Sequence, residues 1–411
     1  MKESQGNKKN PVIVLTGATG FLGSHLMARL LQGGSRLIVL GRSTKEETLP
    51  ARISKLLRWF GMDACTDRLE TVEIDFSKPK IGIPETAYNK LCARAGQVIH
   101  CASDTNFSER KRDRVFAANV QALSGILEFA AHGRAKAFNY ISTAYVAGIN
   151  HAVCREILPE ASAFVNVYEE SKARAEAVIA SFCEKNSVPL KIIRPSIVFG
   201  DSRTGRSLKF NALYFPIKTV QYIRDIYLND IRNNGGEKSQ KSGIFIDAEG
   251  YLLLPLRVYL PQKGSINLIP VDYFVDATHK IITGDSPGGI FHLTNNSAPT
   301  LATLATYNEE FMKIRGVEII YGRAGSAAMR NPVEELFDRF IEPYRPYLSD
   351  IRIFDRANTD LATDRLQPPE FTHEIFKRCM DYAIRVNWGG TIFSEMNSEN
   401  EQVGISQVAQ R

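Results

Sequence analysis

Tyr168 and Lys172 are the residues of this chain whose types and spacing best suit proton transfer. Residues four apart share one face of a helix, so the ammonium of Lys172 can lie beside the phenol of Tyr168. A neighbouring cation favours the phenolate, which predicts a lowered pKa and a Tyr168 that exchanges its proton near neutral pH. The hydroxyl of Thr143, at the end of the apolar segment 136–142, could donate to the same substrate oxygen, with Ser142 as the competing hydroxyl. Together these groups suit hydride transfer to or from a carbonyl.

A glycine-rich turn near the N-terminus predicts a phosphate-binding site. Gly17, Gly20 and Gly23 follow the apolar segment 12–16 and precede a helical pattern. Such glycines allow a tight turn, close approach of the backbone to a pyrophosphate, and close packing of helix and strand. The helix N-terminus adds unpaired N–H groups and a partial positive charge. We therefore expect a dinucleotide at this turn, contacted also by Thr19, Phe21 and Leu22.

The elements that position these residues alternate between short apolar runs and helical patterns. Strands separated by helices imply right-handed crossovers and a parallel sheet that is covered on both faces. We therefore predict an α/β fold, a Rossmann-type doubly wound parallel sheet with a smaller, mainly helical C-terminal substrate lobe. Ligands then bind beyond the carboxyl ends of the strands. The predicted strands are 12–16, 36–40, 70–74, 97–100, 136–142 and 189–194, and the predicted helices are 21–33, 46–60, 85–94, 109–132 and 165–185.

The alternating pattern breaks after Gly200, which sets the expected domains. Residues 11–200 form the nucleotide-binding domain, to which the chain returns at 266–295. The substrate lobe comprises 201–265 and 296–394. The polar ends, 1–10 and 395–411, are expected to be disordered.

Composition excludes several function classes. Six scattered cysteines without a C-x-x-C pair favour reduced thiols over a metal site, so we expect no metal. The net charge of +6 is too diffuse to indicate nucleic-acid binding. No apolar run approaches the ~20 residues of a transmembrane helix, and the polar start does not resemble a signal peptide. We therefore expect a cytoplasmic protein without a transmembrane segment.

The end of the second predicted strand indicates the cofactor. An acidic residue there would bind the ribose 2′-hydroxyl of NAD, whereas an arginine accommodates the 2′-phosphate of NADP. Arg42 has this position, and Arg52 on the following helix could supply a second positive charge. NADP is therefore the expected cofactor, although both arginines could instead be solvated surface residues.

The glycine turn, Thr143, Tyr168 and Lys172 together resemble the extended short-chain dehydrogenase/reductase superfamily. The resemblance selects Thr143 over Ser142, because it fixes the register from Gly148. It implies that Tyr168 gives the proton and that Lys172 holds the nicotinamide ribose. The resemblance also implies a structural role for Asn119.

The same resemblance adds further cofactor contacts after the strands. Asp75 is placed like a residue that contacts the adenine amino group, although a turn aspartate is an equal alternative. The small residues after the fourth strand are similar to a segment that runs under the cofactor. The complete set of such contacts is Asp75, Phe76, Cys101, Ala102, Ser103, Pro195, Ser196 and Val198.

Five segments narrow the resemblance to one branch of the superfamily, the fatty acyl-CoA reductases and thioester reductases. They are Ile141–Val146, Tyr168–Glu176, Ile193–Val198, Gly200–Gly205 and Leu268–Tyr273. The branch implies NADPH-dependent reduction of an acyl thioester, carried on coenzyme A or an acyl-carrier protein, to an aldehyde, which a second hydride could reduce to an alcohol. Two alternatives use the same residues: a ketone or hydroxysteroid oxidoreductase, and a sugar-nucleotide epimerase or dehydratase. Arg42 counts against the epimerase, which prefers NAD.

Overall fold

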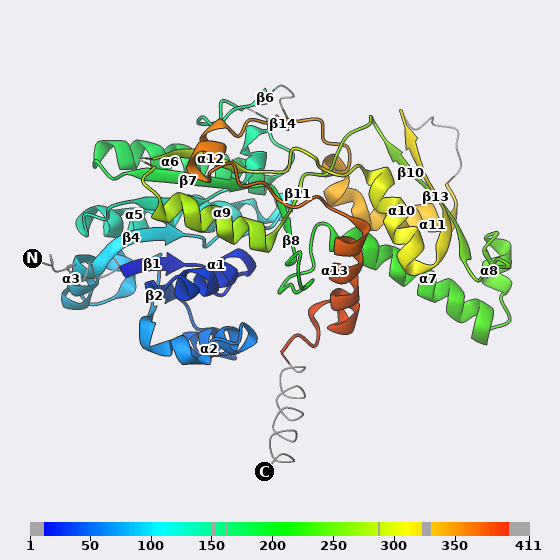
Figure 1. The fold of residues 1–411 in the computed structure, drawn as a ribbon, viewed down its shortest axis with the longest axis horizontal. Helices are drawn as coiled ribbons and strands as arrows, with labels where there is room; N and C mark the ends of the chain where they lie inside the picture. The colour runs from blue at the N-terminus through cyan, green and yellow to red at the C-terminus, as the bar shows by residue number, and fades with distance from the viewer. Residues whose placement is uncertain (1–11, 150–152, 162, 287, 323–329, 394–411) are drawn as a thin grey trace, which may run out of the picture. The chain divides into compact units, whose positions relative to one another are not determined.

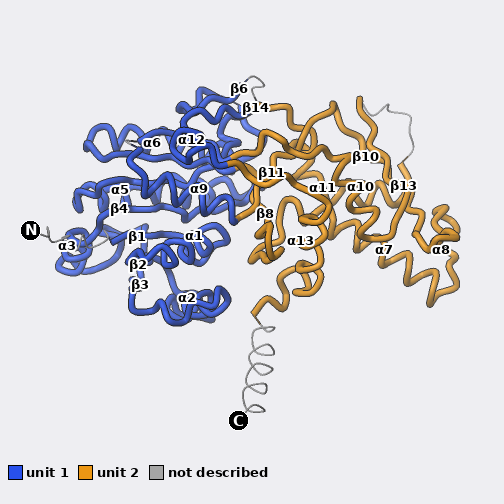
Figure 2. Tube along the Cα trace, viewed as in Figure 1, with its two compact units in different colours: residues 1–195, 272–293, 354–366 blue, residues 196–271, 294–353, 367–411 orange. Residues whose placement is uncertain are grey.

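The structure is a computed structural model that describes residues 12–149, 153–161, 163–286, 288–322 and 330–393 (Figure 1). The ends predicted to be disordered, 1–10 and 395–411, lie outside these ranges. The chain divides into two compact units, coloured separately in Figure 2. Unit 1 comprises the chain up to Pro195, Asp272–Leu293 and Phe354–Leu366, and unit 2 comprises Ser196–Val271, Thr294–Ile353 and the chain from Gln367 onward.

Unit 1 contains a seven-stranded parallel sheet, because its strands are separated by helices long enough for crossover connections. The strand order reverses between β1 and β4, which lie side by side. This order confirms the expected α/β fold with a Rossmann-type doubly wound sheet. In spatial order the strands are β12 (Gly289–Leu293), β7 (Leu190–Pro195), β5 (Phe138–Ile141), β4 (Ala95–His100), β1 (Val12–Thr16), β2 (Arg36–Gly41) and β3 (Leu69–Glu73).

Helices cover both faces of this sheet. Alternate strand residues such as Val14, Val98 and Ile192 pack with apolar residues of three helices to form one buried core. On the other face, Arg29 pairs with Asp276, and Lys191 donates to the Ile281 carbonyl. The helices of the first face are α3 (Glu85–Arg94), α5 (Leu123–His132) and α6 (Val167–Lys185); α1 (Phe21–Gln32) and α9 (Val271–Thr283) supply the contacts on the second, and unit 1 also contains α2 (Leu49–Trp59), α4 (Arg112–Phe116), α12 (Ala357–Ala362) and the short strand β6 (Val153–Cys154).

The helix predicted over 109–132 is interrupted. A π-helical turn at Ala117–Gln121 separates α4 from α5, and Asn119 lies inside it. Single π-helical turns often mark functional sites because they redirect side chains. The sequence periodicity did not reveal this interruption.

Unit 2 combines helices with strands. β10 pairs with β13 in parallel and with β9 in antiparallel fashion, and β8 pairs with β11. The lobe expected to be mainly helical therefore also contains a three-stranded sheet. The elements are β8 (Ile197–Phe199), α7 (Tyr214–Asn233), α8 (Glu237–Lys241), β9 (Phe245–Ile246), β10 (Leu252–Leu260), β11 (Leu268–Pro270), α10 (Leu301–Met312), β13 (Ile314–Tyr321), α11 (Pro332–Ile341) and α13 (His373–Arg385), and β14 (Ile353–Phe354) lies at the boundary of the units.

Two further findings concern the chain as a whole. The segment 354–366, which the sequence analysis placed in the substrate lobe, groups with unit 1 in the structure. Among the helices of the described ranges, none has the length and apolar character needed to cross a bilayer.

Candidate active site

The turn between β1 and α1 requires glycine at two positions. Gly17 has a φ of +75°, and a Cβ there would lie 2.5 Å from the Ala102 nitrogen. A Cβ on Gly23 would lie 2.2 Å from the Gly17 carbonyl oxygen. Both approaches are closer than any side chain allows, so the sequence pattern reflects real steric demands.

The N-terminus of α1 fits a pyrophosphate. Gly20 is the N-cap, no side chain caps the helix, and the first turn contains no acidic residue. The first N–H groups of the helix and its partial positive charge therefore suit an anion. Thr19 lies in the turn, and Phe21 and Leu22 begin the helix. Their contacts with the cofactor remain predictions.

The segment after β4 lies against this turn. The Ala102 nitrogen donates to Thr16 Oγ1 at 3.3 Å, and the Cys101 nitrogen donates to the Thr16 carbonyl at 3.3 Å. The strand ends of β1 and β4 are thus joined where a doubly wound sheet binds its ligand. We keep the prediction that Cys101, Ala102 and Ser103 run under the cofactor.

Asn119 has the structural role that was expected. Its Oδ1 accepts from Ser103 Oγ and the Asp104 nitrogen, at 3.1 and 2.7 Å. Its Nδ2 donates to the Asp104 carbonyl and to Ser171 Oγ, each at 2.9 Å. Because Ser171 precedes Lys172, Asn119 joins the segment after β4 to the helix that carries the predicted catalytic pair.

Two arginines are joined by a hydrogen bond just after the end of β2. Arg42 is exposed directly after the strand, and Arg52 Nη1 donates to the Arg42 carbonyl at 2.9 Å. Their contact with the 2′-phosphate stays a prediction. The sequence analysis missed Glu73, which pairs with Gly41 across β2 and β3 and accepts a hydrogen bond from Ser43 Oγ. The strand register could have revealed this carboxylate.

Asp75 forms a turn after β3. Its Oδ1 accepts from Ser77 Oγ and from the Ser77 nitrogen, at 2.6 and 3.0 Å. These bonds, with Lys78 nearby, lower the pKa of Asp75. The structure therefore shows Asp75 in the role of a turn aspartate, which was the alternative to an adenine contact. The adenine contact stays a prediction. The neighbouring Phe76 ring lies 6.0 Å from the buried His100 ring, centroid to centroid.

Thr143 and Ser142 follow β5, and both are buried. Thr143 Oγ1 accepts from the Tyr145 nitrogen at 3.3 Å and caps a short 3₁₀ turn. A hydroxyl that accepts this bond keeps its proton available for donation. Ser142 Oγ, in contrast, has no hydrogen-bond partner within the described residues.

The predicted catalytic pair, Tyr168 and Lys172, lies on α6, but the expected direction of the pKa shift of the tyrosine is wrong. Desolvation raises the pKa of Tyr168 above its ordinary value, and lowers the pKa of the buried Lys172 to about 7. Lys172 Nζ donates to the Ile141 carbonyl at 2.7 Å and lies 4.0 Å from the centroid of the Tyr140 ring. Burial thus keeps Tyr168 protonated, as a proton donor requires.

The remaining predicted contacts divide between the units. Pro195 ends β7 in unit 1, whereas Ser196 and Val198 belong to unit 2. Their place at the cofactor stays a prediction. No group of three His, Cys, Asp or Glu side chains suited to a metal ion occurs among the residues that the structure describes.

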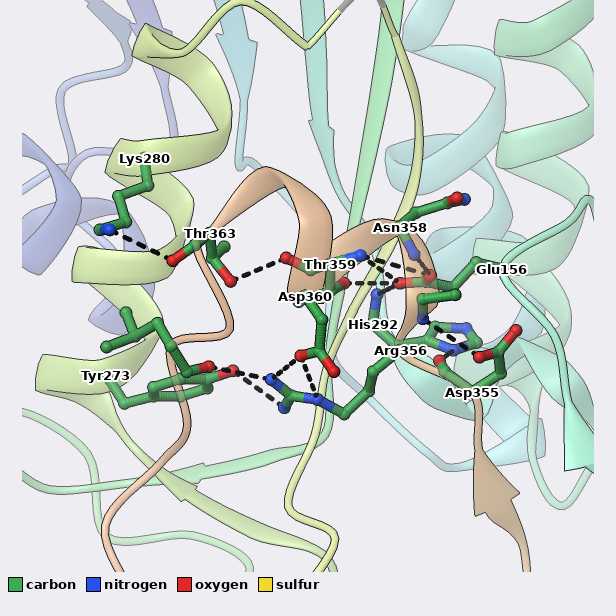
Figure 3. Close-up of polar contacts among 12 residues, drawn as sticks. Glu156, Tyr273, Lys280, His292, Asp355, Arg356, Asn358, Thr359, Asp360 and Thr363 are labelled. Carbon is green, nitrogen blue, oxygen red and sulfur yellow. Dashed lines mark hydrogen bonds and ion pairs between the residues drawn. The ribbon is translucent and has the colours of Figure 1, made fainter.

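A buried polar network, which the sequence analysis missed, joins the segment 354–366 to other parts of unit 1 (Figure 3). Glu156 accepts from the His292 and Asn358 nitrogens at 2.7 and 2.5 Å and from Thr359 Oγ1 at 2.5 Å. Arg356 Nη1 donates to the Tyr273 hydroxyl at 2.9 Å. Glu156 thereby holds the segment 354–366 against the sheet.

The same network reaches α6 through Arg194 on β7. Arg194 pairs with Glu176, and its Nη1 donates to His292 Nε2 at 3.1 Å. Because Nε2 accepts, the ring proton is on Nδ1, which donates to the Asp355 carbonyl at 2.8 Å. Burial and the Arg194 charge lower the pKa of His292 to about 3, so the ring is neutral.

The chain was compared with known families and proteins. Residues 15–278 match a family of NAD-binding domains described as male sterility protein. The chain is 25% identical over 390 residues to a linear gramicidin synthase of Brevibacillus parabrevis, covering 90% of this chain and 7% of that protein. It is 32% identical over 138 residues to the L-2-aminoadipate reductase large subunit of Penicillium chrysogenum, covering 32% of this chain and 10% of that protein. The chain thus spans about a tenth of the length of these relatives.

Solved structures share the fold. The terminal R domain from the myxalamid PKS-NRPS pathway matches with a TM-score of 0.72 and 23% identity, covering 92% of both chains. UDP-glucuronic acid 4-epimerase from Bacillus cereus, in complex with NAD, matches with a TM-score of 0.60 and 15% identity, covering 92% of this chain and 98% of that one. Both likenesses concern the fold alone.

Proposed function

The chain belongs to the male sterility family of NAD(P)-binding domains, which are extended short-chain dehydrogenase/reductase enzymes, and from that premise we propose that it reduces an acyl thioester with NADPH. The observation that carries this proposal is the similarity to linear gramicidin synthase, which is 25% identical over 390 residues, or 90% of this chain. The L-2-aminoadipate reductase, a second relative, is named for a reduction. The thioester is proposed to arrive on an acyl-carrier protein or on coenzyme A.

The residues at the carboxyl edge of the sheet fit the cofactor. Gly17 and Gly23 leave no room for side chains, and the uncapped N-terminus of α1 suits the pyrophosphate. Arg42 and Arg52 would hold the 2′-phosphate of NADPH, which is why we favour it over NADH. When bound, the nicotinamide supplies hydride to the thioester carbonyl.

The chain's own groups then stabilise the negative charge and deliver the proton. The Thr143 hydroxyl donates a hydrogen bond to the carbonyl oxygen of the thioester as negative charge develops on that oxygen. Tyr168 then donates its proton to the same oxygen. Lys172 anchors α6 to the end of β5 through the Ile141 carbonyl, and Thr143 follows that strand two residues later, which supports a shared site for Tyr168 and Thr143. One thioester, one NADPH and one proton give one aldehyde, one thiol and one NADP⁺.

A second hydride transfer could convert the aldehyde to an alcohol with the same residues. Residues 203–241 of unit 2 hold more basic than acidic side chains and could attract a phosphate-bearing carrier arm. A fatty acyl-CoA substrate and a carrier-bound substrate share this chemistry.

Thiol titration during turnover tests the proposal. Purified protein is incubated with NADPH and a panel of acyl-CoAs, acyl-carrier proteins, ketones and nucleotide sugars. We expect NADPH oxidation together with release of one thiol for each aldehyde formed. Oxidation with a ketone alone, and no thiol release from any thioester, would transfer the chain to the ketone-reductase class.

A further inference from the structure

Unit 2 contains an apolar cavity of its own. Its empty volume, which includes space open to solvent, is about 750 Å³. Much of the wall comes from α7, α10, α11, β10 and β13, with residues such as Ile217, Val220, Leu256, Leu304 and Phe337. The described residues that line it include no charged side chain. A charged ligand group would therefore remain unpaired there.

An asparagine breaks this apolar lining. Asn308 lies on α10, its side chain is buried with 6% of the residue exposed, and Oδ1 has no hydrogen-bond partner within the described residues. A buried polar atom without a partner costs ~1–3 kcal/mol, and asparagine is unfavourable inside a helix. Packing alone thus gives no reason for an amide at this position.

Other polar groups of the cavity wall do not meet this demand. Tyr344 and Tyr347 line the cavity, and the hydroxyl of Tyr344 is hydrogen-bonded by the backbone of Ala212. A water molecule on Asn308 would need two to four polar partners, and apart from the two tyrosines the other described lining residues have apolar side chains. The amide is therefore suited to a polar group carried by a ligand.

A row of aromatic rings links the cavity wall to the surface of unit 2. Tyr222 and Phe340 are exposed, with centroids 6.4 Å apart. Phe215 lies 6.4 Å from Phe340 and 5.3 Å from Tyr344, which lines the cavity. The ring contacts thus continue from two exposed aromatic side chains to a residue of the cavity wall, and exposed apolar surface of this kind can mark a ligand-binding groove.

We propose that this cavity binds the acyl chain of the substrate, and that Asn308 recognises a hydroxyl group on that chain. The inference rests on the proposed thioester reduction and names its substrate class, a hydroxylated acyl chain that is otherwise apolar. An alkyl chain is stabilised by about 25 cal/mol for each Å² of apolar surface buried. A hydroxyl both donates and accepts, so it satisfies either orientation of the amide.

Binding measured without NADPH tests this inference separately from catalysis. The probes are the N-acetylcysteamine thioesters of decanoic acid and of its monohydroxy isomers, with calorimetry as the measurement. We expect at least one hydroxylated isomer to bind about tenfold more tightly than the plain chain. Asn308→Leu should abolish that preference and tighten binding of the plain chain, because leucine has nearly the shape of asparagine without its polar atoms. Asn229→Leu, an exposed position on α7 outside the cavity, should keep the preference.

Two further measurements test the inference even if Asn308→Leu does not fold. In the unaltered protein, a methoxy group in place of the preferred hydroxyl removes the donor and should weaken binding to the level of the plain chain. Ala305→Phe fills the cavity and should abolish binding of every probe while NADPH still binds.

Different results would overturn different parts of the inference. Equal binding of all isomers, or an unchanged preference in Asn308→Leu, overturns the role of Asn308. Probe binding that survives Ala305→Phe overturns the cavity assignment, even if thioesters are reduced. The predicted binding pattern without reduction of any thioester would instead overturn the proposed function.

Discussion

Glu176 and Arg194 form an ion pair that is completely buried, with 2.5 Å between Oε2 and Nη2. Glu176 lies one helical turn after Lys172 on α6, and Arg194 lies on β7 immediately before Pro195. The pair therefore fixes the helix that carries the predicted catalytic residues to a central strand of the sheet.

Removal of one partner from this pair should strongly destabilise unit 1. Glu176→Gln leaves the Arg194 charge buried without compensation, which costs ~3–5 kcal/mol in the free energy of unfolding. Urea denaturation measures the change. Glu70→Gln breaks the exposed pair of Glu70 with Arg94, and should cost less than ~1 kcal/mol. A loss of similar size in both variants would show that the buried pair does not stabilise the fold.

The residues of this site differ in how far sequence could predict them. Tyr168 and Lys172 were found because their spacing is local, and Thr143 because it follows an apolar strand. Glu156 was missed because its partner Thr359 lies 203 residues away, and no periodicity links two segments so far apart in the sequence. Glu176 could have been suspected, since it shares a helical face with Tyr168 and Lys172.

The direction of the Tyr168 pKa shift could not be predicted for a related reason. Spacing predicted that Lys172 shares a helical face with Tyr168, but it could not show that desolvation governs the pKa of Tyr168. The same holds for Asn308, whose missing partner becomes visible only when the cavity around it is known.

Tyr168→Phe should abolish reduction and leave NADPH binding nearly unchanged, because only the proton-donating oxygen is lost. Steady-state NADPH oxidation and a fluorescence titration measure the two properties. Lys172→Ala should impair both, since this lysine is proposed to contact the ribose. Tyr251→Phe, in unit 2 and outside the cavity lining, is the control and should retain turnover. Near-normal turnover of Tyr168→Phe would mean that the pair is structural.

Thr143 and Ser142 can be separated by single substitutions. Thr143→Val keeps the shape and removes the hydroxyl, and should lower kcat by ~10²–10³, the usual cost of one donor to a developing oxyanion. Ser142→Ala removes a hydroxyl that has no partner within the described residues, so turnover and stability should change little. A larger loss of kcat for Ser142→Ala would exchange the two assignments.

Cofactor preference should depend on Arg42. Arg42→Asp replaces the proposed contact with the 2′-phosphate by a repulsion, and should erase the preference for NADPH over NADH. Arg36→Asp, exposed at the opposite end of the same strand, is the matched control and should retain it. Dissociation constants for both cofactors give the answer. Equal affinities in the unaltered protein would contradict the proposal, and would direct attention to Glu73 as a ribose ligand.

The buried Lys172 should make the stability of the protein depend on pH. Burial lowers its pKa to about 7 in the folded chain, against ~10.4 in an exposed lysine. Between these values the unfolded chain binds a proton that the folded chain does not, so the free energy of unfolding rises with pH over this window.

Lys172→Met removes the titrating group, and with it the pH dependence of the free energy of unfolding that Lys172 causes. Relative to the unaltered protein, the variant should be most stable at or below pH 7, and its advantage should shrink as the pH rises toward 10. Each unit of pKa shift corresponds to ~1.4 kcal/mol, so the total change across the window should reach a few kcal/mol. Urea denaturation between pH 6 and pH 10 measures it, with Lys185→Met, exposed on the same helix, as the control. Parallel pH profiles for Lys172→Met and the unaltered protein would show that Lys172 stays charged in the folded chain, so that its ammonium is stabilised by its contacts with the Ile141 carbonyl and the Tyr140 ring.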